Sequence, residues 1–351
     1  MAHWNGRGKL ALYIHGARTE QGVRLMIYRL APERIELVVE PGCWSYVGNV
    51  HKVQPLSLGQ GCEAIGLAAH EIGHALGFYH HHARHDRDEH LIIDETKVKA
   101  GEHDQFIKQT TETNDNYGLP YEFGSIMHYG SRRFVISALK YRGMIVFISF
   151  SADKSRWHTM IPVDRRYIET LGSHFVSFYD KLMMNTHYNC LEKCKSNPLA
   201  AKCAMGGFPN PKDCSKCVCP GGYGGRLCNE RPNGCGNVLQ ATTNYLKFED
   251  IIGQSWIKKT VENDFFLKCH YWIEAPLGRI IEVKFHNYSS PGKVDIDGCY
   301  FAGVEIKTQK DQRSTGYRQV FKSESNIVPI ITYSRVWPTK TELWYRMGRR
   351  N

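Results

Sequence analysis

The sequence HEIGHALGFYHHHARHDRD, residues 70–88, contains six histidines in nineteen positions. Apolar and small side chains recur at helical spacing from residue 62 to residue 80, which predicts a buried helix that ends near Gly77. Residues four apart lie on one face of a helix, so His70 and His74 can point their imidazoles at one position. Because Gly77 has no Cβ, the helix can end there in a left-handed turn, after which the chain swings back.

The chemistry of this pattern is that of a zinc site. The returning chain brings His80 to the two helical histidines, and three imidazole nitrogens are typical zinc ligands. Glu71, beside the first ligand, could accept a proton from a water held by the metal. An HExxH pattern arises by chance, but HExxHxxGxxH followed by a methionine turn is far more specific. The sequence SIMHY, residues 125–129, supplies that turn, so we predict one zinc ion per chain.

Simpler interpretations exist for each of these residues. The three histidines could be surface side chains, but the glycine and the methionine turn would then be coincidences. Met127, which we expect beneath the metal, would more often be a core residue if taken alone, and Tyr129 could be a packing aromatic. Four further histidines are interpreted as solvated side chains rather than as a second metal site: His81, His82, His85 and His90.

Composition and cysteine usage indicate a secreted protein of two or three domains. Eight of the twelve cysteines lie between Cys190 and Cys235, which is typical of a disulfide scaffold from an oxidising compartment. Asn287 begins an acceptor sequence for N-glycosylation. The net charge of +10 is spread along the chain and does not predict nucleic-acid binding. No stretch approaches membrane-spanning length, and no signal peptide is visible, so we interpret the N-terminus as incomplete.

Strand patterns lie on both sides of the cysteine-rich segment. IELVV, residues 35–39, predicts a buried strand, and GCWSYVG, residues 42–48, a turn into another short strand. Several short alternating segments near the C-terminus predict an all-β sandwich: residues 271–275, 280–286, 303–308 and 326–333.

These motifs together resemble the astacin family of zinc metalloendopeptidases, which are metzincins. The resemblance rests on HEIGHALGFYH, RHDRD and SIMHYG and extends to GCWSYVG, to PYEFGSIMHYG and to IPVDRRYIETLG at residues 161–172. The cysteine block at residues 194–228 is similar to an EGF-like module, and CHYWIEAPLGRIIEVKF at residues 269–285 is similar to part of a CUB domain. This order of modules resembles the secreted astacins of nematodes.

The resemblance implies an α+β metzincin-like protease domain, followed by a small disulfide-rich EGF-like module and an all-β CUB-like sandwich. The implied boundaries are an atypical, incomplete N-terminal part at residues 1–31, the astacin-like catalytic domain at 32–190, the EGF-like module at 191–229, the CUB-like domain at 235–335 and a basic tail at 336–351.

The resemblance also implies roles for single residues. His70, His74 and His80 would bind zinc, and Glu71 would be the general base. Tyr129 would be an additional weak ligand that swings away and donates a hydrogen bond to the tetrahedral oxyanion, a double role that suits a phenol. The six cysteines of residues 194–228 alone allow fifteen pairings. The resemblance implies five disulfides in the chain: Cys43–Cys62, Cys194–Cys214, Cys203–Cys217, Cys219–Cys228 and Cys235–Cys269.

The sequence departs from the family pattern at several places. His81 stands where the family usually has glutamate, and no cysteine precedes Cys43 to pair with Cys190. VISALKYRGMIVFISF, residues 135–150, interrupts the pattern and is interpreted as an insertion. Cys299 also lacks its expected partner, and the acidic residue of calcium-binding CUB domains is absent, so we predict no calcium.

We therefore predict a secreted zinc endopeptidase that hydrolyses extracellular or cuticular matrix proteins by metal-activated water. Its partner would be a protein substrate, with no nucleic acid and no membrane span, and its oligomeric state stays open. The alternative is a non-catalytic extracellular binding protein with a degenerate protease domain, which the departures from the pattern motivate.

Overall fold

The computed structural model describes residues 33–99, 101–132, 158–253, 266–292, 297–316 and 321–349, together with two short strand pairs. In the first pair, β1 (Arg18–Thr19) lies antiparallel to β2 (Gly22–Val23). In the second, β7 (Leu139–Tyr141) lies antiparallel to β8 (Met144–Val146). This second pair falls within the interpreted insertion, and the other residues of 135–150 lie outside the described part of the chain.

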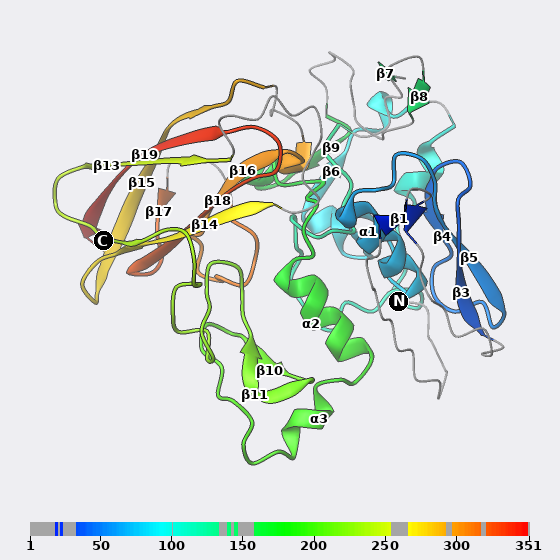
Figure 1. The fold of residues 1–351 in the computed structure, drawn as a ribbon, viewed down its shortest axis with the longest axis horizontal. Helices are drawn as coiled ribbons and strands as arrows, with labels where there is room; N and C mark the ends of the chain where they lie inside the picture. Colours follow the sequence, from blue (N-terminus) through cyan, green and yellow to red (C-terminus); the bar gives the residue numbers. More distant parts are fainter. Residues whose placement is uncertain are drawn as a thin grey trace.

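The described residues of the N-terminal domain, between residues 33 and 190, form small sheets and two α-helices (Figure 1). A three-stranded sheet has the order β3 (Arg34–Val38), β5 (Val53–Leu58), β4 (Cys43–Ser45), and helix α1 (Ile65–Ala75) packs on β4 and β5. The predicted strand IELVV corresponds to β3, but its residues are half-buried or exposed rather than buried. The Cys43–Cys62 disulfide joins β4 to the segment that precedes α1.

The rest of this domain is built mainly from short elements. Strand β6 (Leu91–Ile93) pairs antiparallel with β9 (Met160–Pro162). Helix α2 (Phe178–His187) begins with a capping box between Ser177 and Asp180. Single 3₁₀ turns connect these elements at His81–Ala83, Arg87–Glu89, Glu95–Lys97, His103–Phe106 and Arg165–Tyr167.

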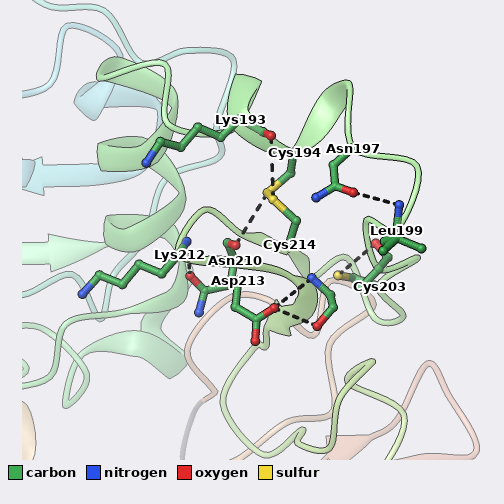
Figure 2. Close-up of a disulfide and its surroundings, with 11 residues drawn as sticks. Lys193, Cys194, Asn197, Leu199, Cys203, Asn210, Lys212, Asp213 and Cys214 are labelled. Carbon is green, nitrogen blue, oxygen red and sulfur yellow. Dashed lines mark hydrogen bonds between the residues drawn. A yellow bond between two sulfur atoms is a disulfide. The ribbon is translucent and has the colours of Figure 1, made fainter.

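The cysteine module, residues 191–229, has few apolar side chains and is held by disulfides. It contains helix α3 (Glu192–Lys195) and the antiparallel pair β10 (Phe208–Asn210) and β11 (Asp213–Val218). Three disulfides cross it: Cys194–Cys214, Cys203–Cys217 and Cys219–Cys228. Figure 2 shows the first of them, which joins α3 to β11. These are the pairs that the family resemblance implies.

In the described part of the C-terminal sandwich, the strands form two four-stranded sheets. One has the order β12 (Val238–Gln240), β14 (Leu267–Glu274), β18 (Ile327–Ser334), β16 (Ala302–Ile306). The other has the order β13 (Leu246–Ile252), β19 (Thr339–Arg349), β15 (Arg279–Ser289), β17 (Phe321–Lys322). A 3₁₀ turn at Asp297–Cys299 precedes β16, and the Cys235–Cys269 disulfide ties the start of the sandwich to β14. The four C-terminal segments predicted as strands all lie in this sandwich or at its strand ends.

The prediction that residues 336–351 form a basic tail is wrong. Residues 339–349 form β19, which pairs with β13 on one side and with β15 on the other. Leu343 and Tyr345 of this strand are buried in the sandwich core, together with Ile281 and Val283 of β15. The strand was missed because its intervening charged residues hide the alternation of inward-facing side chains.

Among the described residues, the structure has no helix whose length and apolar character would allow it to cross a membrane.

Candidate metal centre

The end of helix α1 determines where the third histidine lies. The helix ends at Ala75, and Gly77 follows with a φ of 97°, a left-handed conformation that glycine adopts without strain. Gly77 N–H donates to the His74 carbonyl at 2.8 Å, and Phe78 N–H donates to the Gly73 carbonyl at 3.0 Å. The left-handed glycine and these bonds close the helix end and redirect the chain towards His80.

Three imidazole nitrogens converge at this position. His80 Nε2 lies 3.3 Å from His70 Nε2 and 3.1 Å from His74 Nε2. Nitrogens bound at about 2.0–2.1 Å to one tetrahedral zinc ion are roughly 3.3–3.4 Å apart. The three histidines form a group that could hold a metal ion, with one ligand atom from each within 4.8 Å of the others. The donor set and its spacing therefore fit zinc.

The outer ring nitrogens fix the chemical state of two of these imidazoles. His70 Nδ1 lies 2.8 Å from the Ile126 carbonyl oxygen, and His74 Nδ1 lies 2.8 Å from the Phe78 carbonyl oxygen. A carbonyl only accepts hydrogen bonds, so each Nδ1 must carry the proton and each Nε2 must offer its lone pair inward. Both rings are thus held in the tautomer that a metal requires.

The methionine turn lies against α1, as the sequence predicts. Met127 is 1% exposed, and a Cβ at Gly73 would lie 2.7 Å from its Sδ atom, so the turn and the helix are in direct contact. His81 N–H donates to the Met127 carbonyl at 2.8 Å, which joins the turn to the returning chain. The residues that would carry the metal and the turn beneath them therefore form one packed unit.

Asp180 of α2 anchors this turn, and the sequence interpretation missed it. Its buried carboxylate accepts hydrogen bonds from Ser125 Oγ at 2.6 Å and from Ile126 N–H at 3.0 Å. The carbonyl oxygen of the same Ile126 accepts a hydrogen bond from His70 Nδ1. The Ser177-x-x-Asp180 capping box was the local signal, but it predicts only a helix start and not this long-range contact.

Glu71 and Tyr129 lie at the centre, and their catalytic roles stay predictions. Glu71 is buried on α1 beside His70. The Tyr129 ring is also buried, with its centroid 4.1 Å from that of His80 and 6.4 Å from that of His70. Its hydroxyl donates to Gln105 Oε1 at 3.4 Å. The phenol is therefore next to the imidazole cluster, as an oxyanion donor would have to be.

The four histidines interpreted as solvated do not have fully solvated side chains. His81 and His82 are buried, and His85 and His90 are partly buried. The His81 Nε2 atom accepts a hydrogen bond from Glu122 N–H at 3.1 Å, and burial lowers the pKa of His81 well below its usual value. The prediction is wrong for His81 and His82, because a run of polar residues was taken as a solvated face, whereas the His81 ring packs against Tyr121 and the His82 ring against Phe106.

The remaining site residues have defined places. Asn287 is exposed on β15, and its Nδ2 donates a hydrogen bond to Glu342 Oε2 at 3.1 Å. Glycosylation of this residue stays a prediction. Cys190 and Cys299 take part in none of the five disulfides.

A comparison with known families agrees with this geometry. The astacin family of peptidases matches residues 8–189, more than half of the chain. The chain belongs to the astacin family. The match begins well before residue 32, so the part of the chain that we interpreted as atypical lies partly within the astacin region.

The relatives of this astacin-family chain include several nematode proteins. Zinc metalloproteinase nas-31 of Caenorhabditis elegans is 42% identical over 92% of this chain, which spans 50% of that relative. Zinc metalloproteinase nas-25 of the same species is 32% identical over 86% of this chain, which spans 73% of it. Among solved structures, high choriolytic enzyme 1, a hatching enzyme zinc-protease from the medaka fish Oryzias latipes, is 27% identical with a TM-score of 0.38. That match covers 47% of this chain and 74% of the fish protein.

Proposed function

We propose that this chain is a secreted, zinc-dependent endopeptidase that hydrolyses internal peptide bonds of extracellular or cuticular matrix proteins. The observation that carries the proposal is the convergence of three Nε2 atoms, two of them on imidazoles whose outer nitrogens donate to backbone carbonyls. Relatives that are named zinc metalloproteinases support both the metal and the reaction. Five disulfides support an oxidising compartment.

In this proposal His70, His74 and His80 would hold one zinc ion, which would supply Lewis-acid chemistry at the substrate carbonyl and at water. Glu71 takes a proton from the attacking water and delivers it to the amine that leaves. Tyr129 donates its phenol proton in a hydrogen bond to the oxyanion that develops at the cleaved carbonyl, a contact that stabilises the transition state. The backbone carbonyls of Ile126 and Phe78 keep two of the imidazoles oriented throughout.

We also propose the modular organisation. The astacin-like catalytic domain would run to residue 190, the EGF-like module would span residues 191–229, and the CUB-like domain would begin at residue 235 and include β19. Three closely spaced disulfides support the EGF-like assignment, and two four-stranded sheets around one core support the CUB-like assignment. These modules would place or bind the matrix substrate. An N-glycan at Asn287 would accompany secretion, and a mass loss on glycosidase treatment of the secreted chain would test it.

The proposed activity is tested with the purified full chain and zinc on casein and denatured collagen. We expect cleavage that a chelator abolishes, that added zinc restores and that Glu71→Gln lowers by at least about 10²-fold, the usual size of a general-base contribution. Glu89→Gln, at an exposed acidic residue of the same segment, is the matched control and should retain activity. A chain that binds zinc and matrix protein yet shows no chelator-sensitive cleavage would support the non-catalytic alternative instead.

A further inference from the structure

One segment of the sandwich lies directly against the astacin domain. This docking segment, residues 297–316, runs from the 3₁₀ turn before β16 to the chain after that strand. Its contacts fall on residues that flank the candidate metal centre in sequence. Arg132 follows Tyr129 by three positions, and Glu122 precedes Met127 by five. The sandwich therefore contacts the same stretch of chain that carries the methionine turn.

The first contact is a buried carboxylate. Glu122 is 1% exposed, and its two oxygens accept Thr315 N–H at 3.3 and 3.1 Å. The same carboxylate accepts Gly124 N–H at 2.9 Å, so it joins the docking segment to the start of the methionine turn. Burial of such a group is costly unless its hydrogen bonds are made. The sandwich thus supplies a donor that this acid requires.

The second contact involves residues that follow the turn in sequence. Asp297 accepts hydrogen bonds from Ser131 Oγ at 2.9 Å and from Arg132 N–H at 2.8 Å, and it forms an ion pair with the Arg132 guanidinium. Gly298 has a φ of 70°, and a Cβ there would lie 1.9 Å from the Gly172 carbonyl oxygen. The two backbones therefore approach so closely at this point that position 298 accommodates glycine but no larger side chain.

The third contact reaches the helix that anchors the turn. Tyr179 Oη donates to Asp311 Oδ2 at 2.5 Å, and the Arg313 guanidinium lies 5.3 Å from the centre of the Tyr179 ring. Tyr179 is adjacent to Asp180, whose carboxylate holds Ser125 and Ile126. The docking segment thus contacts both the residues that flank the methionine turn and helix α2, whose Asp180 anchors that turn.

We propose that the sandwich is a positioning element of the metal centre. The docking segment fixes residues 122–132 and the start of α2, and through them it fixes the Ile126 carbonyl that orients His70. The sandwich then acts on the metal site as the outer partners of metal ligands do, by holding a ligand in the binding geometry. The inference rests on the proposed function only in taking His70, His74 and His80 as metal ligands.

The test is the metal affinity of the full chain, measured with Co²⁺ by its absorption spectrum and with Zn²⁺ by competition with a chromophoric chelator. Asp297→Ala removes the acceptor of Ser131 and Arg132, and we expect it to weaken binding by about 10-fold or more, the usual effect of losing an outer partner of a metal ligand. Asp297→Asn keeps one acceptor oxygen and should restore part of the affinity. Lys284→Ala, at an exposed position on β15, is the control and should bind as the parent does.

The less buried Asp311→Ala provides a second variant, because it removes only the contacts of Tyr179 and Arg313 and is expected to fold. It should also weaken metal binding, with the Co²⁺ spectrum altered. If both alanine variants fold and bind Co²⁺ and Zn²⁺ within twofold of the parent, the inference is overturned while the proposed function stands. If the parent itself binds neither metal, both fail together.

Discussion

The anchoring of the methionine turn gives the sharpest test of how this centre is held. Asp180→Ala would remove the acceptor of three buried hydrogen bonds, from Ser125 Oγ, Ile126 N–H and Ser177 N–H. A buried donor left without its acceptor costs about 1–3 kcal/mol, so the sum for three independent donors would be roughly 3–9 kcal/mol. Burial raises the pKa of Asp180, which means that the carboxylate itself costs free energy to bury. We therefore expect a loss at the lower end, about 3 kcal/mol, out of a typical stability of about 5–15 kcal/mol.

Urea unfolding of the metal-free chain measures this loss without the contribution of bound metal. The same variant should bind Co²⁺ more weakly, because the Ile126 carbonyl that accepts the His70 Nδ1 proton is no longer fixed. Asp180→Asn keeps one acceptor oxygen and should lie between the parent and the alanine variant. Asp213→Ala, at an aspartate outside the domain, should leave the unfolding midpoint of the metal-free astacin domain unchanged.

Two results would refute this reasoning. A loss of less than about 1 kcal/mol in Asp180→Ala would mean that the three donors find other acceptors at little cost. A large loss of stability with unchanged Co²⁺ affinity would mean that the anchoring of the methionine turn does not affect the metal ligands. The proposed link from Asp180 through Ile126 to His70 would then be wrong.

Further predictions concern single features of the same domain. Burial raises the pKa of Glu122 from 4.5 to about 7, so between these pH values the folded chain keeps a proton that the unfolded chain has released. The free energy of unfolding should therefore fall by about 3 kcal/mol as pH rises from 4.5 to 7. Urea unfolding at several pH values should show that Glu122→Gln removes this pH dependence, and an equal pH dependence in the parent and the variant would contradict the assignment. Gly77→Ala, at a φ of 97°, should destabilise the chain by about 1–3 kcal/mol and weaken Co²⁺ binding, as urea unfolding and Co²⁺ titration would measure. Replacing Cys43 and Cys62 together by alanine opens a loop with a sequence separation of 19 and should cost about 3 kcal/mol in thermal or urea unfolding.

The features that could be predicted from the sequence are those set by local spacing. The positions of His70 and His74 follow from the helical period, and the return of the chain to His80 follows from the conformation that Gly77 permits. The sandwich strand Arg279–Ser289 was recognised for the same reason, because Ile281, Val283 and Phe285 alternate with Glu282 and Lys284. In each case the residues that determine the structure lie within one element or one turn.

The features that could not be predicted depend on contacts between distant segments. Asp180 and Ser125 are 55 residues apart, and no periodicity links them. The contact of Glu122 with Thr315 spans 193 residues and joins two different modules. The burial of His81 and His82 depends on aromatic rings supplied by the chain after residue 105. A polar side chain in a single sequence carries no sign of whether a distant segment will cover it.

The pairing of His81 with Glu122 shows how a departure from the family pattern can be accommodated. The family resemblance places a glutamate at position 81, and a carboxylate there would accept hydrogen bonds as an anion. His81 keeps an acceptor, since its Nε2 atom receives Glu122 N–H, and burial lowers its pKa so that the ring stays neutral. A neutral ring needs no counter-charge, so the cost of a buried anion at this position is removed. The buried carboxyl group of this region belongs instead to Glu122, and it accepts a hydrogen bond from the Thr315 N–H of the sandwich. The residue at position 81 and the docking of the sandwich are therefore linked through Glu122, whose N–H donates to His81 and whose carboxyl group accepts the Thr315 N–H.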